Sequence, residues 1–426
     1  MDITEKAEAL SGLELCDHCF GRQFARLGHG LENFERALII EEMLEEGEEI
    51  EEEDIDPEAV PDREVDRSES CKICRGLFQE LDHFADLAMN ALGRYELRTY
   101  LAGTRPPSEV VEAEEELWEE YGLQWVEPIK SELNRLIGKE VEERLEEERG
   151  IDTTVDFERP DVNFIVDMDK DRVELQINSM LIHGFYNKLE RGIPQTEWPC
   201  GNCRGKGCDD CDWTGKQYQE SVQELIAEPL IEATEGLETK FHGAGREDVD
   251  ARCLGKREFV IELLEPQKRD IDLEELQEEI NDRFEGKVQV FNLEFCEKDI
   301  VEDVKSRRSD KTYRALVELS EEVSEDDLEG LSGLKGTVEQ KTPTRVDHRR
   351  ASKTRKRKVL DVSWEKKGEK ELELEVKGEA GLYVKELISG DKSKTKPSVS
   401  QILDTEAECK ELDVVDIEKP EGYKDI

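Results

Sequence analysis

The chain has 426 residues, of which 36% are hydrophobic and 39% charged, and its formal net charge is −48. At about 100–200 residues per domain, this length predicts two to four domains. Apolar residues recur at regular spacings almost throughout, which excludes general disorder. The acidity instead predicts a folded protein adapted to concentrated salt, because the Debye length of about 3 Å at ~1 M salt weakens repulsion between surface carboxylates. No apolar run approaches about 18 residues and no signal-peptide pattern is present, so we expect a soluble, cytoplasmic protein that does not bind membranes.

The first predicted domain is a zinc-binding module over residues 1–90. It contains two C-x2-C pairs, Cys16 with Cys19 and Cys71 with Cys74. One pair can hold one edge of a tetrahedral zinc ion, and a second pair can close the other edge from anywhere in the chain. Eleven cysteines in a cytosolic chain favour metal over disulfides. Reduced core cysteines or a redox role are the alternative.

The second predicted domain is a compact α+β unit over residues 91–190. The stretch "ELRTYLAG" alternates like a strand, and two stretches between residues 109 and 148 have helical spacing. "NFIVDMDKDRVELQIN" predicts a hairpin with its turn at Asp169-Lys170-Asp171.

The third predicted domain, residues 191–426, begins with a second cysteine set. Cys200, Cys203, Cys208 and Cys211 lie within twelve residues, with Gly201, Gly205 and Gly207 between them. Glycines let the backbone turn its amides toward the sulfurs. Four cysteines leave no open position for water, so both sets predict structural rather than catalytic zinc, two ions in all. Cys253, Cys296 and Cys409 are isolated, and we interpret them as packed or incidental.

The remainder of this domain mixes predicted hairpins and helices. Strands are expected in "REFVIELL", "KVQVFNLEFC", "TYRALVELS" and "LELEVKGEAGLYVKELI". This pattern predicts a mixed or antiparallel sheet with helices packed on it. The sequence contains no G-x-G-x-x-G and no Walker sequence, so we expect no organic cofactor. The fold class is therefore α+β and multidomain.

A basic segment stands out against the acidic background. Residues 341–358 carry nine Lys or Arg and one Asp. Such a patch predicts a polyanion site. The candidate phosphate-binding residues here and further on are Arg345, Arg349, Arg350, Arg355, Arg357, Lys392, Lys394 and Lys396. A solvated loop, or an ion-pair partner for the acidic surface, is the alternative.

The motif "GAGREDVDAR", Gly243 to Arg252, places arginines on both sides of Asp248 and Asp250. Glycines let a loop approach a ligand, and a carboxylate beside arginine stays ionised and can act as a nucleophile or base. By itself the motif is more typical of a surface turn with i,i+4 ion pairs than of an active site. Likewise, Tyr313 in one predicted strand and Tyr383, Lys385 and Leu387 on one face of another could be ordinary packing.

Together these motifs resemble those of pseudouridine synthases. The chain is most similar to the archaeal and eukaryotic tRNA pseudouridine-54/55 synthases, the tenth Pus family, and to its haloarchaeal-type members. The similar stretches are "GREDVDAR", "KTYRAL", "YVKELISGD", "RVDHRRA", the N-terminal C-x2-C pair and "PCGNCRGKGC". The resemblance covers nearly the whole chain in order. It implies a THUMP-like RNA-binding domain at 91–190 and a pseudouridine synthase catalytic domain at 191–426.

The resemblance also implies roles for individual residues. Asp248 looks like the catalytic aspartate, with Asp250 as the fallback. Arg246 would help to displace or hold the flipped nucleotide. Tyr313 would stack on the uracil and assist removal of the proton from C5. Lys385 would pair with Asp248, and Leu387 would pack against the uracil pocket. Several related families have arginine where this chain has Lys385, so the geometry of that pair is the open point.

The implied reaction is the isomerisation of uridine 55, and also of uridine 54, in the T-arm of tRNA, by a monomer. The target base must leave the stack, which costs a few kcal/mol. The alternatives are a non-catalytic zinc-containing tRNA-binding adaptor, a THUMP-linked methyltransferase or sulfur transferase, and a zinc deaminase. The last lacks its H-x-E…P-C-x-x-C arrangement.

Overall fold

A computed structural model describes residues 2–346 and 351–419 and divides the chain into two compact units, one up to Asn178 and one from Ser179 onward. Two predicted RNA-binding residues, Arg349 and Arg350, lie outside the described residues. Within the described residues, no helix is both long and apolar enough to cross a bilayer.

The first unit is built from six α-helices and a four-stranded sheet within the described residues. Its strands are β1 (Thr99–Arg105), β2 (Thr154–Val155), β3 (Val162–Asp167) and β4 (Arg172–Ile177), in the order β2-β1-β3-β4. Its helices are α1 (Ile3–Ser11), α2 (Asp17–Gly21), α3 (Asn33–Glu46), α4 (Leu81–Leu92), α5 (Ser108–Tyr121) and α6 (Ile129–Arg149). The predicted hairpin is confirmed, since β3 pairs antiparallel with β4 around the predicted turn.

One hydrophobic core runs through this unit. Helix α6 buries Leu133, Ile137, Val141 and Leu145, a stripe at four-residue spacing, and contacts β1. Helix α4 packs against α6, β3 and β4. The same core cluster extends from Ala7 to Met168 and includes the four N-terminal cysteines. The predicted zinc module and α+β unit therefore share a core.

Within residues 179–346 and 351–419, the second unit is built on a ten-stranded sheet in the order β13-β10-β11-β12-β9-β14-β7-β5-β8, with β6 paired to β7. Its strands are β5 (Met180–Lys188), β6 (Glu238–Gly243), β7 (Arg252–Leu264), β8 (Val288–Phe295), β9 (Lys311–Leu319), β10 (Gly336–Lys341), β11 (Thr354–Lys366), β12 (Glu371–Gly378), β13 (Thr395–Lys396) and β14 (Ala407–Ile417). Strand β5 belongs to this sheet, so the second unit begins before the boundary predicted at residue 190.

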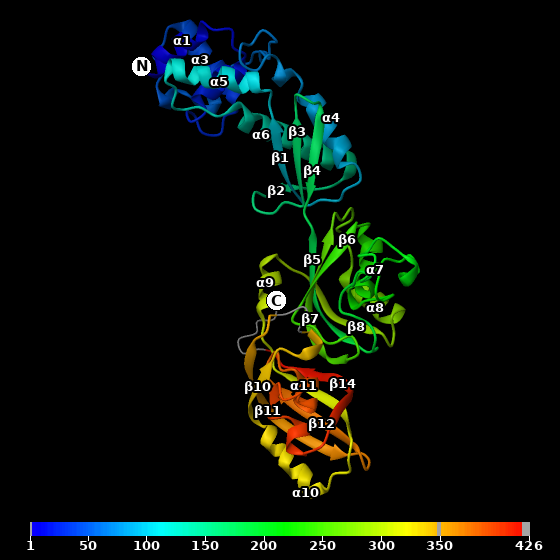
Figure 1. Cartoon of the computed structure of the whole chain (residues 1–426). Coiled ribbons are helices and arrows are strands. Elements are labelled where there is room, and N and C mark those ends of the chain that lie inside the picture. Colours follow the sequence, from blue (N-terminus) through cyan, green and yellow to red (C-terminus); the bar gives the residue numbers. More distant parts are fainter. Residues whose placement is uncertain (1, 347–350, 420–426) are drawn as a thin grey trace. The chain divides into compact units, whose positions relative to one another are not determined.

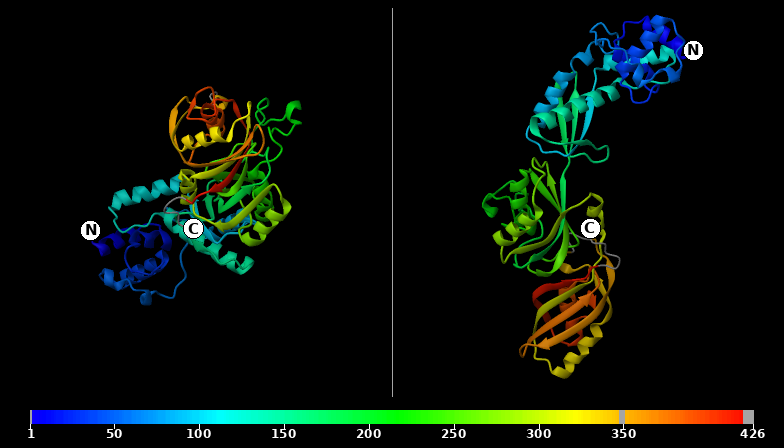
Figure 2. Two further views of the ribbon diagram at one scale, coloured as in Figure 1. Left: turned by 90° about the horizontal axis from the view of Figure 1, so that it is seen from below. Right: turned by 180° about the vertical axis from the view of Figure 1, so that it is seen from behind.

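Helices cover this sheet over three hydrophobic clusters in the described part of the unit. The helices are α7 (Val222–Thr234), α8 (Leu273–Arg283), α9 (Asp299–Ser306), α10 (Glu325–Leu328), α11 (Val384–Ser389) and α12 (Val399–Ile402). Helices α7 and α8 lie side by side against the part of the sheet formed by β5, β7 and β8 (Figures 1 and 2). Helix α11 and the segment around α10 pack on the part formed by β9 to β12 and β14. Strand β14 joins the two parts, parallel to β7 and antiparallel to β9. The predicted mixed sheet with flanking helices is confirmed.

One predicted strand is wrong. The stretch after Tyr383 forms helix α11, with Tyr383 at its N-cap and Gly390 closing it at φ +74°. Val384, Leu387 and Ile388 are buried at helical spacing, i, i+3 and i+4. In a helix, positions two apart point in different directions, so Lys385 and Leu387 do not share a face.

Candidate functional site

The acidic motif forms the loop between β6 and β7. Gly243 ends β6, and a side chain there would collide with Gln195, because a Cβ on Gly243 would lie 2.7 Å from Nε2 of Gln195. Gly245 turns the loop with φ +75°, a conformation that favours glycine. The presence of glycine is therefore explained by close packing at position 243 and by the backbone conformation at position 245. Arg252, the second arginine of the motif, binds Asp413 of β14 through two hydrogen bonds of 3.0 and 2.6 Å.

Glu247, the central residue of Arg246-Glu247-Asp248, anchors this loop in the core. Its side chain and that of Arg257 on β7 are each 1% exposed, and Oε2 of Glu247 lies 2.9 Å from Nε of Arg257. Arg257 also donates a hydrogen bond to the carbonyl of Ala244 (3.0 Å). An ion pair so fully buried is stable only while both partners remain. No pattern in the sequence indicated this pair.

Two residues of β5 complete the anchor. The hydroxyl of buried Tyr186 donates to Glu247 (3.2 Å) and accepts from Gln195 (2.8 Å). Lys188 is fully buried, and its ammonium donates to the carbonyls of Ile193 (2.8 Å), Asp248 (3.1 Å) and Val249 (3.0 Å). Burial lowers the pKa of Lys188. These bonds fix the backbone on which Asp248 stands.

Asp248 and Asp250 share a cluster with two cations. Asp248 lies 3.0 Å from Nη1 of Arg345 and 3.6 Å from Nζ of Lys385. Lys385 is closer to Asp250, with both carboxylate oxygens within 2.7 Å. Partial burial favours the neutral form of Asp250, but its bonds to Lys385 outweigh this and lower its pKa. The predicted pairing of Lys385 with Asp248 is therefore shared with Asp250.

A cavity of about 440 Å³ opens beside Asp248, within the size range of ligand sites, about 300–1,000 Å³. Its lining includes ten basic residues, Arg246, Arg257, Lys305, Arg307, Arg308, Lys311, Arg345, Arg355, Arg357 and Lys385. Of the described residues that line it, two are acidic, Glu247 and Asp248. In a chain of net charge −48, this cavity is a concentrated basic site. Asp250 does not line it among the described residues, and its side chain is 71% exposed.

The cavity brings together most of the predicted substrate-binding residues. Arg246 lies exposed at its edge, and Tyr313 and Tyr383 line it. Burial raises the pKa of Tyr313 to about 12, so its phenol keeps its proton near neutral pH. Leu387 does not reach the cavity; it is fully buried in the core, and Leu382 and Val384 line the cavity instead.

The predicted phosphate-binding residues divide between two places. Arg345, Arg355 and Arg357 line the cavity with Asp248. Lys392 and Lys396 line a second, larger cavity of about 920 Å³ at the other end of α11. Lys394 donates to the carbonyl of Thr342 at 3.5 Å and lines neither cavity in the described part of the chain.

Two polar contacts fix the cations of the cluster. The side-chain amide of buried Gln340 on β10 binds both the N–H and the carbonyl of Tyr383 at 2.9 Å, which holds the start of α11 and hence Lys385. Buried Glu386 accepts a 2.7 Å bond from Nε of Arg345. Burial disfavours the charge on Arg345, but Glu386 and Asp248 raise its pKa.

Lys311 is a cavity residue that the sequence did not single out. It stands two positions before Tyr313 on β9, so both side chains point to the same face. Its ammonium donates to the carbonyl of Ser309 (2.8 Å). Burial, and then the neighbouring charge of Arg257, lower its pKa from 10.5 to about 8.

Replacing Lys311 with methionine should therefore stabilise the protein at pH 7 by about 1–3 kcal/mol. The unfolded chain keeps this proton up to pH 10.5 and the folded chain only to about pH 8. The wild type should recover the lost stability as pH rises from about 8 to 10.5, and the variant should not. Denaturant unfolding of both proteins at pH 7 and 10 measures the difference, and a less stable variant at pH 7 would refute it.

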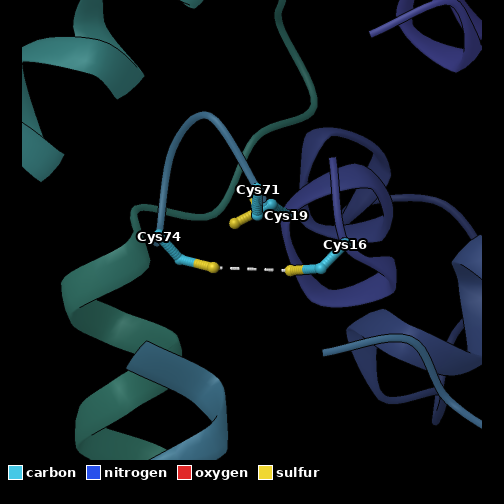
Figure 3. A group of neighbouring side chains, drawn as sticks. All are labelled: Cys16, Cys19, Cys71 and Cys74. Carbon is cyan, nitrogen blue, oxygen red and sulfur yellow. Dashed lines mark hydrogen bonds between the residues drawn. The ribbon is translucent and has the colours of Figure 1, made fainter. Parts of the chain in front are cut away.

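The N-terminal cysteines converge on one point. The ligand atoms of Cys16, Cys19, Cys71 and Cys74 all lie within 4.8 Å of one another, and all four residues are buried. Figure 3 shows the sulfurs of Cys16 and Cys74 facing each other, 3.5 Å apart. Four thiolates at about 2.3 Å from a tetrahedral ion lie about 3.8 Å apart, so this set fits a metal ion.

Buried Arg22 supports this cysteine set. Its side chain is 0% exposed, and Nη2 lies 3.6 Å from the sulfur of Cys19. It also forms an ion pair with buried Glu114 of α5. A metal site with four thiolates carries excess negative charge, which a neighbouring guanidinium offsets.

The second cysteine set also has metal-site spacing. Sulfur–sulfur distances are 3.9 Å for Cys200 and Cys208, 3.8 Å for Cys203 and Cys211, and 3.7 Å for Cys208 and Cys211. As predicted, amides turn toward the sulfurs, with N–H donors from Gly207 to Cys203 (3.2 Å) and from Gly215 to Cys211 (3.3 Å). Desolvation opposes ionisation, but the amides of Cys208 and Gly215 lower the pKa of Cys211 to about 7.

Comparison with known proteins gives consistent matches along the chain. A family model described as "Pus10, C-terminal" matches residues 181–418, and one described as "Pus10 THUMP domain, archaeal" matches residues 84–167. The second match confirms the predicted THUMP-like unit.

Curated relatives match over almost their full length. The chain is 42% identical to the tRNA pseudouridine synthase Pus10 of Methanothrix thermoacetophila, covering 95% of this chain and 91% of that protein. It is 42% identical to the protein of the same name from Halorubrum lacusprofundi, covering 98% and 97%. A solved Cbf5-Nop10-Gar1 complex aligns with 45% of this chain and 44% of that one, at 18% identity and a TM-score of 0.28, too low to support any inference.

Proposed function

The chain belongs to the Pus10 family, and on this premise we propose that it isomerises uridine 55, and also uridine 54, in the T-arm of tRNA to pseudouridine. The observation that carries the proposal is the cavity itself. It combines Asp248 with Tyr313 and with exposed cations, among them Arg246, Lys305 and Arg308, that suit an RNA backbone.

The reaction needs no redox change and no group donor. The N1–C1′ bond of uridine breaks and a C5–C1′ bond forms, while C5 loses a proton and N1 gains one. Asp248 acts as the nucleophile or base, and Arg345 and Lys385 pair with it at 3.0 and 3.6 Å. Asp250 orients Lys385 from outside the cavity.

The remaining cavity residues hold the flipped nucleotide. Tyr313 stacks on the uracil, with its phenol protonated because its pKa is raised to about 12. Arg246 at the edge holds the displaced nucleotide, and Arg345, Arg355 and Arg357 contact phosphates. Stacking and phosphate contacts offset the few kcal/mol that base flipping costs. We expect a cytoplasmic monomer to act on the tRNA.

Position-specific transcripts test the assignment. Unmodified tRNA transcripts are incubated with the protein at high salt and mapped by carbodiimide-blocked primer extension. A transcript with both uridines should show stops at 55 and 54, and cytidine at either position should remove only its own stop. No stop in the T-arm would refute the proposal and leave the non-catalytic adaptor.

We also propose that both cysteine sets hold structural zinc. Metal analysis should give two zinc ions per chain, and Cys200→Ser should retain one. Cys409→Ser is the matched control and should retain two, because Cys409 belongs to neither set. A wild-type zinc content near zero would contradict this proposal.

A further inference from the structure

The segment from Lys305 to Lys311, which runs from the last turn of α9 to the first residue of β9, lines the cavity with four cations. Its sequence, "KSRRSDK", follows Glu302 and Asp303, so the local charge pattern did not indicate a basic site. We propose that Lys305, Arg308 and Lys311 form a second phosphate-binding surface of this cavity, in addition to the one formed by Arg345, Arg355 and Arg357. This surface, called the second wall below, contacts the RNA backbone beside the nucleotide in the cavity. This proposal rests on the proposed function.

Arg307 differs from its neighbours because it is anchored in the protein. Its Nη1 lies 2.6 Å from Oε1 of Glu258, which is 6% exposed and also binds His183 at 2.9 Å. Arg307 therefore fixes the segment against β7. Lys305 and Arg308 are exposed, and neither forms an ion pair with any described residue. Unpaired cations are available to a ligand without first breaking an internal contact.

Lys311 is the inner end of this wall. An ammonium has three N–H donors, and one of them binds the carbonyl of Ser309. Burial, and then the neighbouring charge of Arg257, disfavour the charge of Lys311 and lower its pKa. A bound anion would favour the charged form of Lys311, because its opposite charge offsets the repulsion from Arg257. Tyr313, two residues on, is on the same face, so the base and its phosphate would meet adjacent side chains of β9.

The charge pattern favours RNA phosphates as the ligand. The proposed wall and the basic residues Arg355 and Arg357 of β11 line the same cavity. Tyr313 in that cavity offers a stacking surface, which a nucleobase uses.

Salt-dependent binding of full-length unmodified tRNA tests the proposal. Each lost phosphate contact reduces the slope of log Kd against log salt concentration by about 0.7–0.9. Lys305→Ala with Arg308→Ala should raise Kd at least about tenfold and reduce the slope by about 1.5. Most of the loss in kcat/KM should be in KM. Arg314→Ala is the control, because Arg314 is an exposed cation on β9 that pairs with Glu375 and lies outside the cavity; it should bind as the wild type does.

Lys311→Met supplies a second readout that a structural role would not give. It should weaken tRNA binding and flatten the salt dependence while it raises stability at pH 7. If the wild type forms pseudouridine but these variants keep its Kd and salt slope, the second wall is refuted and the proposed function stands. If the wild type forms none, the proposed function fails, and the salt slopes still report whether the wall binds RNA.

Discussion

Asp248→Asn should lower the rate of pseudouridine formation by about 10³-fold or more, with tRNA binding retained. Asparagine keeps the size of the side chain but cannot carry the charge that a nucleophile or base needs. The loop should stay in place, because Glu247, Arg257 and Lys188 hold it through bonds that do not involve the Asp248 side chain. Single-turnover kinetics with excess enzyme, together with filter binding, separate the chemical step from affinity.

Asp250→Asn is the matched control for this prediction. Asp250 is 71% exposed and holds Lys385 from outside the cavity, so its loss should slow the reaction by about tenfold or less. The reverse pattern, with Asp250→Asn inactive and Asp248→Asn active, would transfer the catalytic role to Asp250.

Glu247→Ala should destabilise the protein by about 3–5 kcal/mol, because it leaves the guanidinium of Arg257 buried without its charged partner. The hydroxyl of Tyr186 would lose its acceptor as well. Activity should fall at the same time, since the loop that carries Asp248 loses its anchor. Denaturant unfolding followed by circular dichroism gives the free energy, with activity measured at each denaturant concentration.

Two further variants test whether the buried ion pair is the cause. Glu375→Ala removes an exposed carboxylate that pairs with Arg314 and should cost less than about 1 kcal/mol. Replacing both Glu247 and Arg257 with methionine should recover much of the loss, because neither charge is then buried alone. A double variant no more stable than Glu247→Ala would show that the pair's charge is not what matters.

The sequence predicted those features that depend on fixed spacing. The two cysteine sets and the β3–β4 hairpin turn follow local rules, and the structure has them where they were expected. Helix α11 does not follow such a rule. "LYVKELI" is short, apolar and rich in residues common in strands, and for so short a run helix and strand cannot be told apart. Its helical form depends on contacts from β10, where Gln340 holds Tyr383.

The residues that hold the site in place were harder to predict, for a different reason. Glu247, Arg257 and Lys188 are charged residues, and such residues are almost never fully buried. Glu247 and Arg257 are buried because they pair with each other, and Lys188 is buried because backbone carbonyls accept its hydrogen bonds. Lys311 lines the cavity, but in the sequence it lies among both acidic and basic residues. The sequence around it therefore did not stand out as basic. The motifs of the site could be predicted from the sequence alone. The residues that hold these motifs in place could be identified only from the fold.

The most direct test of the account is tritium release from tRNA labelled with [5-³H]uridine, because C5 loses its hydrogen when pseudouridine forms. With enzyme in excess, the wild type should release tritium in a single turnover from the T-arm uridines, and Asp248→Asn, with tRNA bound, should release it about 10³-fold more slowly. Absence of release by the wild type, or equal release by Asp248→Asn, would contradict the account.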